Sequence, residues 1–164
     1  MRNVLLLAAA ALSLTACNRN TAIGNDREAQ LDHAPQPAKI ESAASALQNV
    51  STAIIKPETM SDADIAALGG ERGRCAVVLT EVAYPSFLYE PGRSGAIKLN
   101  GKLIPLAASG ENRFADGGLT VTLRRLEEES NAGSQGIEMI VVPPSAKDEI
   151  GYHGYARCYQ GREA

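Results

Sequence analysis

Apolar and polar residues form short segments from Cys75 to Tyr159, and turn residues separate these segments. Leu119–Leu123 alternates apolar with hydroxylated side chains, which is typical of a strand with one buried face. Asn100-Gly101 favours a two-residue type I′ hairpin turn, because both positions of that turn need a positive φ. The expected strands are Cys75–Val82, Tyr84–Tyr89, Ala96–Leu99, Lys102–Leu106, Leu119–Leu123, Ile137–Val142 and Tyr152–Tyr159.

These segments predict an all-β domain over residues 71–164. No long helical segment separates them, so the strands are expected to pair with their neighbours in the chain. The fold class is therefore a small antiparallel barrel or sandwich of about seven or eight strands.

A short helix is expected before this domain, within residues 58–70. Ser61 followed by Asp64 is typical of a helix N-terminus, and acidic residues suit the positive end of the helix dipole. Gly69-Gly70 predicts the end of the helix.

Residues 17–57 are expected to form a partly helical or disordered tether. They contain prolines and many small polar residues but no aromatic residue, so they offer little apolar surface to offset the entropy of ordering. If Lys39–Ile55 became helical, its apolar residues would form one weak stripe. Two interpretations stay open: a solvated spacer, or a helix that docks on the domain or on a partner.

The first residues have the pattern of an export signal. Arg2 precedes the run Val4–Leu14, which is apolar except for Ser13. This run is too short to cross a hydrocarbon core of about 30 Å as a helix. A basic start, a short apolar run and small residues at its end are typical of a secretion signal.

Leu14-Thr15-Ala16-Cys17 resembles the lipobox of bacterial lipoproteins. The resemblance implies that residues 1–16 are a signal peptide and that Cys17 carries diacylglycerol and an amide-linked acyl chain such as palmitate. Asn18 is not the aspartate of an inner-membrane retention signal, so we expect the periplasmic face of the outer membrane. The alternative is an ordinary secreted protein with a chance cysteine at this boundary.

The charge of the chain argues against nucleic-acid binding. The full chain has 16 basic and 19 acidic residues. Removal of residues 1–16 takes Arg2 away and leaves 15 against 19, a formal charge of −4. A nucleic-acid-binding protein needs a concentrated basic surface, and here basic residues are scattered among acidic ones.

Two cysteines remain for the domain. Cys75 and Cys158 lie in the first and last expected strands, so a disulfide between them would clamp the ends of the domain. The chain-entropy model gives such a long loop about 4–5 kcal/mol of stabilisation. The alternative is a metal site with His153, but His33 lies in the tether and no Cys-x-x-Cys spacing exists. We expect neither a metal nor another cofactor.

Catalytic patterns are weak, and we predict that the protein is not an enzyme. A hydrolase triad needs a serine, a base and an acid, and no serine stands in a strand-to-helix elbow with His153 available as the base. The triplet Glu127–Glu129 supplies neighbouring acids for glycoside chemistry, but we expect a solvated loop tip without the fixed separation that this chemistry needs. The serines considered are Ser86, Ser94, Ser109 and Ser134.

Two segments resemble the membrane-bound inhibitors of c-type lysozyme. They are Leu99–Leu106, which contains the Asn-Gly turn, and Ser109–Thr120, which contains a Ser-Gly and an Asp-Gly pair. The resemblance implies an eight-stranded antiparallel barrel whose serine loop enters the lysozyme cleft. It implies that a serine and a later basic residue face the two catalytic carboxylates. The corresponding positions are Ser109 and Gly110 in the loop, Phe114 as its aromatic residue and Arg124 as the basic residue.

Two functions follow from these observations. The first is a lipid-anchored envelope protein with a non-catalytic binding domain, with c-type lysozyme as the partner. The alternative is a structural or scaffold lipoprotein that recognises another envelope component through exposed aromatic residues. The residues for that alternative are Tyr84, Phe87, Tyr89, Tyr152 and Tyr155.

Overall fold

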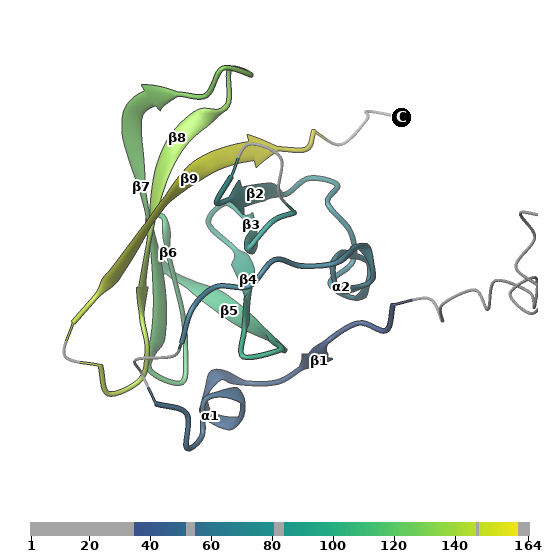
Figure 1. Ribbon diagram of the computed structural model, residues 1–164, viewed down its shortest axis with the longest axis vertical. Coiled ribbons are helices and arrows are strands. Elements are labelled where there is room, and N and C mark those ends of the chain that lie inside the picture. Colours follow the sequence, from purple (N-terminus) through teal and green to yellow (C-terminus); the bar gives the residue numbers. More distant parts are fainter. Residues whose placement is uncertain (1–34, 52–54, 81–83, 147, 161–164) are drawn as a thin grey trace, which may run out of the picture. The chain divides into compact units, whose positions relative to one another are not determined.

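The computed structural model describes residues 35–51, 55–80, 84–146 and 148–160, which all fall within one compact unit. Its elements follow one another from the short strand β1 to the long strand β9 (Figure 1). Their bounds are β1 (Lys39–Ile40), α1 (Ala43–Ala46), α2 (Asp62–Ala67), β2 (Cys75–Val78), β3 (Phe87–Glu90), β4 (Ser94–Leu99), β5 (Lys102–Gly110), β6 (Arg113–Asp116), β7 (Leu119–Glu129), β8 (Gln135–Val142) and β9 (Ile150–Cys158).

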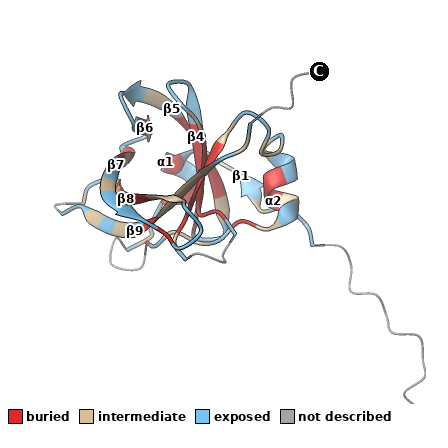
Figure 2. Ribbon diagram, turned by 90° about the horizontal axis from the view of Figure 1, so that it is seen from above, coloured by how far each residue is buried: buried red, intermediate tan, exposed pale blue. Residues whose placement is uncertain are grey.

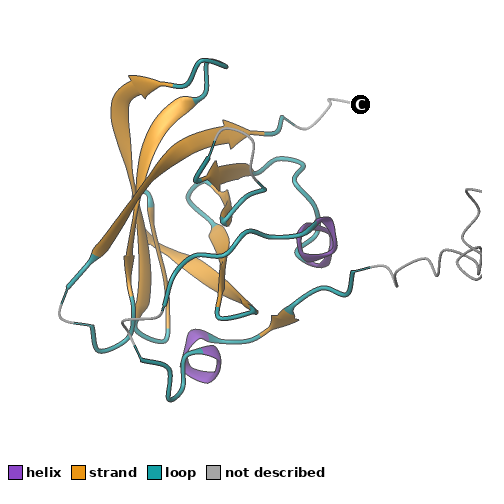
Figure 3. Cartoon of the chain, viewed as in Figure 1, coloured by secondary structure: helices purple, strands orange, loops and turns teal. Residues whose placement is uncertain are grey.

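Strands β2 to β9 form a closed antiparallel barrel of eight strands. Each strand pairs with the next one in the chain, and β9 pairs with β2 to close the ring. The order is therefore that of an up-and-down barrel, a closure that leaves few free strand edges. Figure 3 shows that strands form the bulk of the described domain, and the helices α1 and α2 are short. The prediction of a small all-β barrel is confirmed.

The turn at Asn100-Gly101 joins β4 to β5, as the sequence predicts. Both residues have positive φ, 50° at Asn100 and 66° at Gly101. Leu99 and Lys102 face one another on the two sides of the turn, so the loop has only two residues. This is the type I′ geometry that an Asn-Gly pair favours.

The strands of the barrel pack one face into its interior. Along β7, for example, Leu119, Val121 and Leu123 are buried and the residues between them are not. Three aromatic rings meet inside the barrel, with Phe87 stacked on Tyr89 at 5.5 Å and Phe114 edge-on to both. Because successive side chains of a strand point to opposite faces, this alternation fixes which residues are available on the outside.

The helix α1 lies at one end of the barrel. Ser42 caps the helix, and the Asp116 carboxylate accepts a hydrogen bond of 2.6 Å from the backbone N–H of Ala43. Ala43 and Leu47 are buried in the same apolar cluster as the residues inside the barrel. This end of the barrel is therefore closed by the segment that follows β1.

From residue 35 onward, the described part of the expected tether packs on the barrel, and of the two interpretations left open it follows the docked one, through the short helix α1. Lys39 and Ile40 form β1, which pairs in parallel with the first residues of β5. No long helix forms over Lys39–Ile55 in its described part, because backbone pairing with β5 and burial of α1 direct the chain instead. The first part of the expected tether, residues 17–34, lies outside the described residues.

The helix α2 confirms the predicted helix start. The Ser61 hydroxyl accepts a hydrogen bond from the Asp64 N–H, and the Asp64 carboxylate accepts one from the Ser61 N–H. The helix lies outside the ring of strands (Figure 2). A second apolar cluster fills the space between α2 and the outer face of the barrel, and its buried members are Met60, Ile65, Ala76, Leu88 and Leu103.

Strand lengths differ from the prediction at several places. The first strand ends at Val78, because a turn follows it, and residues 81–83 lie outside the described part. The glutamates Glu127–Glu129 belong to β7, where pairing with β8 carries the strand past its apolar residues. They are exposed, but they do not form the expected loop tip.

The predicted disulfide joins Cys75 and Cys158. The two residues face one another directly in the pairing of β2 with β9. The bond therefore links the strands at the seam where the ring closes. No helix among the described residues is long and apolar enough to cross a membrane.

A methyl group added at Gly95 should destabilise the barrel. An ideal Cβ on this residue would lie within 3 Å of two ring carbons of Phe87, whose side chain is fully buried. We expect Gly95→Ala to lower the free energy of unfolding by about 1–3 kcal/mol, the usual cost of overpacking. Urea unfolding measures this change.

The control for Gly95→Ala is Gly110→Ala, where the nearest atom would lie at 3.7 Å and φ is not positive. We expect this exposed position to tolerate the substitution within about 0.5 kcal/mol. If the two substitutions lowered the free energy of unfolding equally, the result would contradict the packing of Phe87 against Gly95.

Candidate functional site

The end of the barrel opposite α1 holds a cavity of about 390 Å³. The strand directions bring three features to this end: the β5–β6 turn, the β7–β8 turn and the Cys75–Cys158 disulfide. Apolar side chains of Leu123, Ile137 and Ala156 line the cavity from inside the barrel. The volume lies within the range of about 300–1,000 Å³ that small-molecule sites occupy.

The β5–β6 hairpin forms one part of the rim. The resemblance to lysozyme inhibitors implies a protruding serine loop here, but Ser109 and Gly110 belong to β5 and only Glu111 and Asn112 form the turn. Asn112 has a φ of 53°, and its carbonyl accepts a hydrogen bond of 2.8 Å from the N–H of Leu123. The tip is therefore held against β7 as a tight turn.

Ser109, Gly110 and Arg124 are exposed at this same end of the barrel. Gly110 pairs with Arg113 of β6, which in turn pairs with Thr122 of β7, two residues before Arg124. The three predicted binding residues thus lie on the rim, on strands that flank β6. The structure places them at one end of the barrel, where Ser109 and Arg124, both described, form no hydrogen bond with one another.

Phe114 does not belong to this surface. Its side chain is only 1% exposed, and it packs edge-on against Phe87 inside the barrel. The reason is its place in β6, where it pairs with the inward-facing Val121. The aromatic binding role that the resemblance implies for Phe114 is therefore wrong for this chain.

Arg124 is already paired. Its side chain is 64% exposed, and its guanidinium forms an ion pair with the carboxylate of Glu138 on β8. The Nε2 atom of His153, on β9, lies 3.7 Å from the other oxygen of the same carboxylate. A row of polar side chains therefore crosses β7, β8 and β9 on the outer face, and a partner's carboxylate would compete with Glu138 for Arg124.

Arg125 is the residue that the sequence analysis missed. It follows Leu119, Val121 and Leu123 at two-residue spacing, so it lies on the inward face and lines the cavity. The strand bulges directly after it, and the Gln135 amide holds the bulge through a hydrogen bond of 2.6 Å to the Leu126 carbonyl. The two-residue alternation that continues from Leu123 to Arg125 indicates this position, but the predicted strand ended at Leu123.

Tyr89 lies beside Arg125 in the wall of the cavity. Burial raises the pKa of the Tyr89 hydroxyl above its usual value of 10, and the positive charge of Arg125 offsets part of this effect. The hydroxyl therefore stays protonated at neutral pH and is available as a hydrogen-bond donor. Arg125 and Tyr89 thus form a polar pair above an apolar interior.

Two of the aromatic residues expected to form a surface for a scaffold role are buried, and two others, Tyr152 and Tyr155, are partly buried. Phe87 and Tyr89 lie on the inward face of β3 and are buried inside the barrel, whereas Leu88 between them lies on the outer face. Tyr84 is 52% exposed, and its hydroxyl donates to the Asp62 carboxylate at 3.3 Å. Tyr152 packs against the interior cluster as well.

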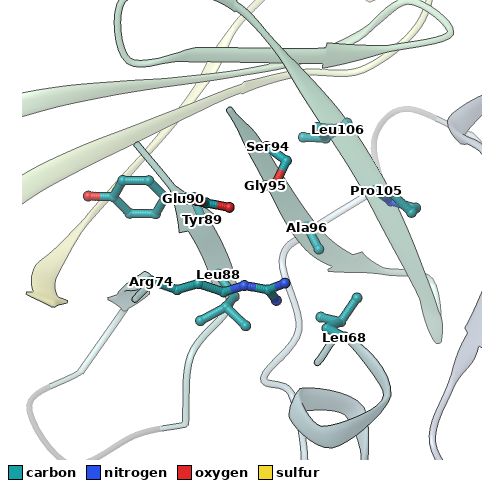
Figure 4. A pocket seen from close by; sticks show the side chains of 10 residues that line it. All are labelled: Leu68, Arg74, Leu88, Tyr89, Glu90, Ser94, Gly95, Ala96, Pro105 and Leu106. Atoms are coloured by element: carbon teal, nitrogen blue, oxygen red, sulfur yellow. The ribbon is translucent and has the colours of Figure 1, made fainter. Parts of the chain in front are cut away.

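A second depression lies on the outer face of β3, β4 and β5, next to the end of α2 (Figure 4). Arg74 extends along Leu88 there, while Tyr89 points to the opposite side of β3. The volume of this groove, about 180 Å³, is below the usual range for a small-molecule site. The larger cavity at the end of the barrel is therefore the better candidate.

Other predicted chemistry has less structural basis. In the described part of the chain, no group of three or more His, Cys, Asp or Glu side chains is placed to hold a metal ion. Ser86, one of the serines considered as a nucleophile, is fully buried, whereas His153 lies on the outer face. Cys17, the expected lipidation site, lies outside the described residues.

Comparison with known proteins identifies a family that covers most of the chain. The model of a family described as "Domain of unknown function (DUF6692)" matches residues 13–161. No curated protein matches the chain, and no solved structure matches it.

Proposed function

The chain belongs to the DUF6692 family, and from the geometry of its site we propose that it is a lipid-anchored protein of the bacterial envelope with a non-catalytic binding domain. The observation that carries the proposal is the arrangement at the open end of the barrel. Ser109 and Gly110 on β5 and Arg124 on β7 are exposed there, and the hydrogen bond from the Leu123 N–H to the Asn112 carbonyl holds the tight β5–β6 turn against β7. A rigid rim of this kind loses little conformational entropy when it docks.

Export is supported by two independent features. Leu14-Thr15-Ala16-Cys17 resembles a lipobox, which supports lipidation of Cys17 and attachment to the periplasmic face of the outer membrane. The disulfide between Cys75 and Cys158 is the kind of bond that persists in oxidising compartments. Two or three acyl chains on one residue would anchor the domain stably.

We propose c-type lysozyme as the partner. Arg124 would face the acidic cleft of the enzyme and exchange Glu138 for a catalytic carboxylate, while Ser109 would donate a hydrogen bond. Charge-assisted hydrogen bonds from arginine to carboxylates are among the stronger polar contacts. Glu111 at the tip of the same rim would repel the cleft, which limits the expected affinity.

Inhibition of muramidase activity tests this partner. Residues 18–164 without the lipid should inhibit c-type lysozyme in a turbidity assay with bacterial cell walls. Arg124→Glu should weaken inhibition at least about tenfold, because it replaces attraction by repulsion at a desolvated contact. Lys56→Glu, the same charge reversal at the α1 end, is the matched control and should inhibit like the wild type.

Undiminished muramidase activity at a large molar excess of the wild-type domain would exclude lysozyme as the partner. The alternative would then be a scaffold lipoprotein with another envelope partner. Phe87 and Tyr89 are buried and cannot contact such a partner, whereas Tyr84 is exposed and could do so. Pull-down from envelope extracts with the wild type and with Tyr84→Ala tests it, and equal recovery would contradict a role for this side chain.

A further inference from the structure

The cavity at the open end of the barrel faces inward, unlike the rim that holds Arg124. Its apolar part consists of Leu123, Ile137 and Ala156, and its polar part includes Arg125 and the Tyr89 hydroxyl. A pocket that combines an apolar wall with a few polar groups is the usual form of a small-molecule site. Eight-stranded barrels have room for side chains or for one small ligand in their interior.

Arg125 determines which ligand would fit. The tandem arginines of β7 are both exposed but have different surroundings: Arg124 pairs with Glu138 on the outer face, whereas Arg125 lines the mouth of the cavity. Among the described residues, Arg125 makes no ion pair and no hydrogen bond through its side chain. A guanidinium without a carboxylate partner, next to an apolar wall, favours a ligand that brings an anionic group.

One acidic residue also lines the cavity. Glu111 lies in the β5–β6 turn, and it forms no ion pair with Arg125 in the described structure. Both residues are exposed at the mouth of the cavity, but Glu111 lies at the tip of the turn, whereas Arg125 lies close enough to the buried Tyr89 for its charge to act on that hydroxyl. The negative charge of Glu111 therefore opposes anion binding at the edge of the cavity without neutralising Arg125.

We propose that the open end of the barrel binds a small molecule with an apolar body and one carboxylate. The apolar body would contact Leu123, Ile137 and Ala156, and the carboxylate would accept hydrogen bonds from Arg125 and from the Tyr89 hydroxyl. This site is separate from the rim that we propose for lysozyme, and neither proposal depends on the other.

Calorimetric titration with octanoate, octylammonium and octanol tests the site in residues 18–164. Octanoate should bind, and octylammonium should not, because only the carboxylate complements Arg125. Arg125→Gln should weaken octanoate binding at least about tenfold, the effect of losing one charge-assisted contact. Octanol should bind the wild type and Arg125→Gln equally weakly, because it has no charge.

Three further variants make the test specific. Arg113→Gln removes an equal charge from the outer face of β6, the strand that pairs with β7. This variant should leave octanoate binding unchanged. Ala156→Leu fills the cavity without a change of charge and should abolish binding, while Glu111→Gln removes the opposing charge and should strengthen it. Near-ultraviolet circular dichroism verifies that each variant is folded.

Two results would overturn the proposal. The first is the absence of octanoate binding to the folded wild type. The second is octanoate binding that Arg125→Gln leaves unchanged or that octylammonium matches. Because the lysozyme assay depends on Arg124 and this titration on Arg125, either proposal can fail while the other stands.

Discussion

Replacing Asp64 with alanine should lower the free energy of unfolding by about 3–5 kcal/mol, the cost of breaking a buried ion pair from one side. Asp64 is only 1% exposed, and its carboxylate lies 2.7 Å from the ammonium of Lys98. The same carboxylate accepts hydrogen bonds from the N–H groups of Ala38 and Ser61. One side chain therefore joins α2, strand β4 and the segment before β1.

Loss of this carboxylate leaves several donors without an acceptor. The Lys98 side chain is 17% exposed, so its charge is poorly hydrated in the folded state. The backbone donors of Ala38 and Ser61 lie in the part-buried contact between α2 and the barrel. Each buried unsatisfied donor costs about 1–3 kcal/mol. These costs explain why the expected effect exceeds that of an ordinary ion pair.

Urea unfolding of residues 18–164 measures the effect. The matched control is Glu90→Ala, which breaks the surface pair between Glu90 and Arg93, where the arginine side chain is 75% exposed. Exposed pairs contribute at most about 1 kcal/mol, so this control should lose little stability. A loss below 1 kcal/mol for Asp64→Ala would contradict the role assigned to Asp64.

The same ion pair predicts the acid response of the fold. Burial raises the pKa of Asp64, but the hydrogen bonds from Lys98, Ala38 and Ser61 outweigh this effect and lower the pKa from 3.8 to about 2. A carboxyl whose folded pKa is depressed stabilises the fold above its unfolded pKa. About 2 kcal/mol should therefore be lost as the pH falls from about 4 to about 2. Asp64→Ala should show a smaller loss over this interval.

Removal of the disulfide should have a similarly large effect. Cys75 and Cys158 are separated by 83 positions in the sequence, and they join the first and last strands of the barrel. In the chain-entropy model a loop of this length stabilises the fold by about 4–5 kcal/mol. The double variant Cys75→Ala and Cys158→Ala should unfold at a correspondingly lower urea concentration than the oxidised wild type.

Reduction of the wild type provides the control. Excess dithiothreitol should bring the wild type to the stability of the double variant and should not affect the double variant itself. If the free energies of unfolding of the oxidised wild type and the double variant differed by less than about 1 kcal/mol, the disulfide would not stabilise the fold as expected. Single cysteine variants are unsuitable, because the remaining thiol can form intermolecular disulfides.

Local signals in the sequence predicted local structure well. Asn100-Gly101 specifies its turn through backbone φ, and Ser61 with Asp64 specifies the start of α2 through two reciprocal hydrogen bonds. Both interactions involve residues that are close in the chain. The pairing of Cys75 with Cys158 was predictable for another reason, since the chain has three cysteines and we propose lipidation for Cys17.

The structure of residues 39–57 was not predictable in the same way. Their few apolar residues fit the period of a helix, but β1 gains its hydrogen bonds from β5, far away in the sequence. Ala43 and Leu47 are buried because the end of the barrel accepts them, and nothing in their own sequence indicates that environment. Contacts of this kind decide where a domain begins.

The candidate site was predicted in part. Ser109, Gly110 and Arg124 are exposed at one end, as a shared binding surface requires. Phe114 was misplaced, because a resemblance in residue order does not determine which face of a strand a side chain occupies. Arg125 was missed for the opposite reason: its charge suggested the end of a strand, whereas the hydrogen bonds of β8 extend β7 beyond it.

Intact-mass spectrometry of the protein purified from bacterial membranes tests whether the chain is exported and lipidated. We expect a chain that begins at Cys17, carries diacylglycerol and an acyl chain, and has the Cys75–Cys158 disulfide formed. An unprocessed chain that begins at Met1 and retains free thiols at Cys75 and Cys158, recovered from the cytosol, would contradict this expectation.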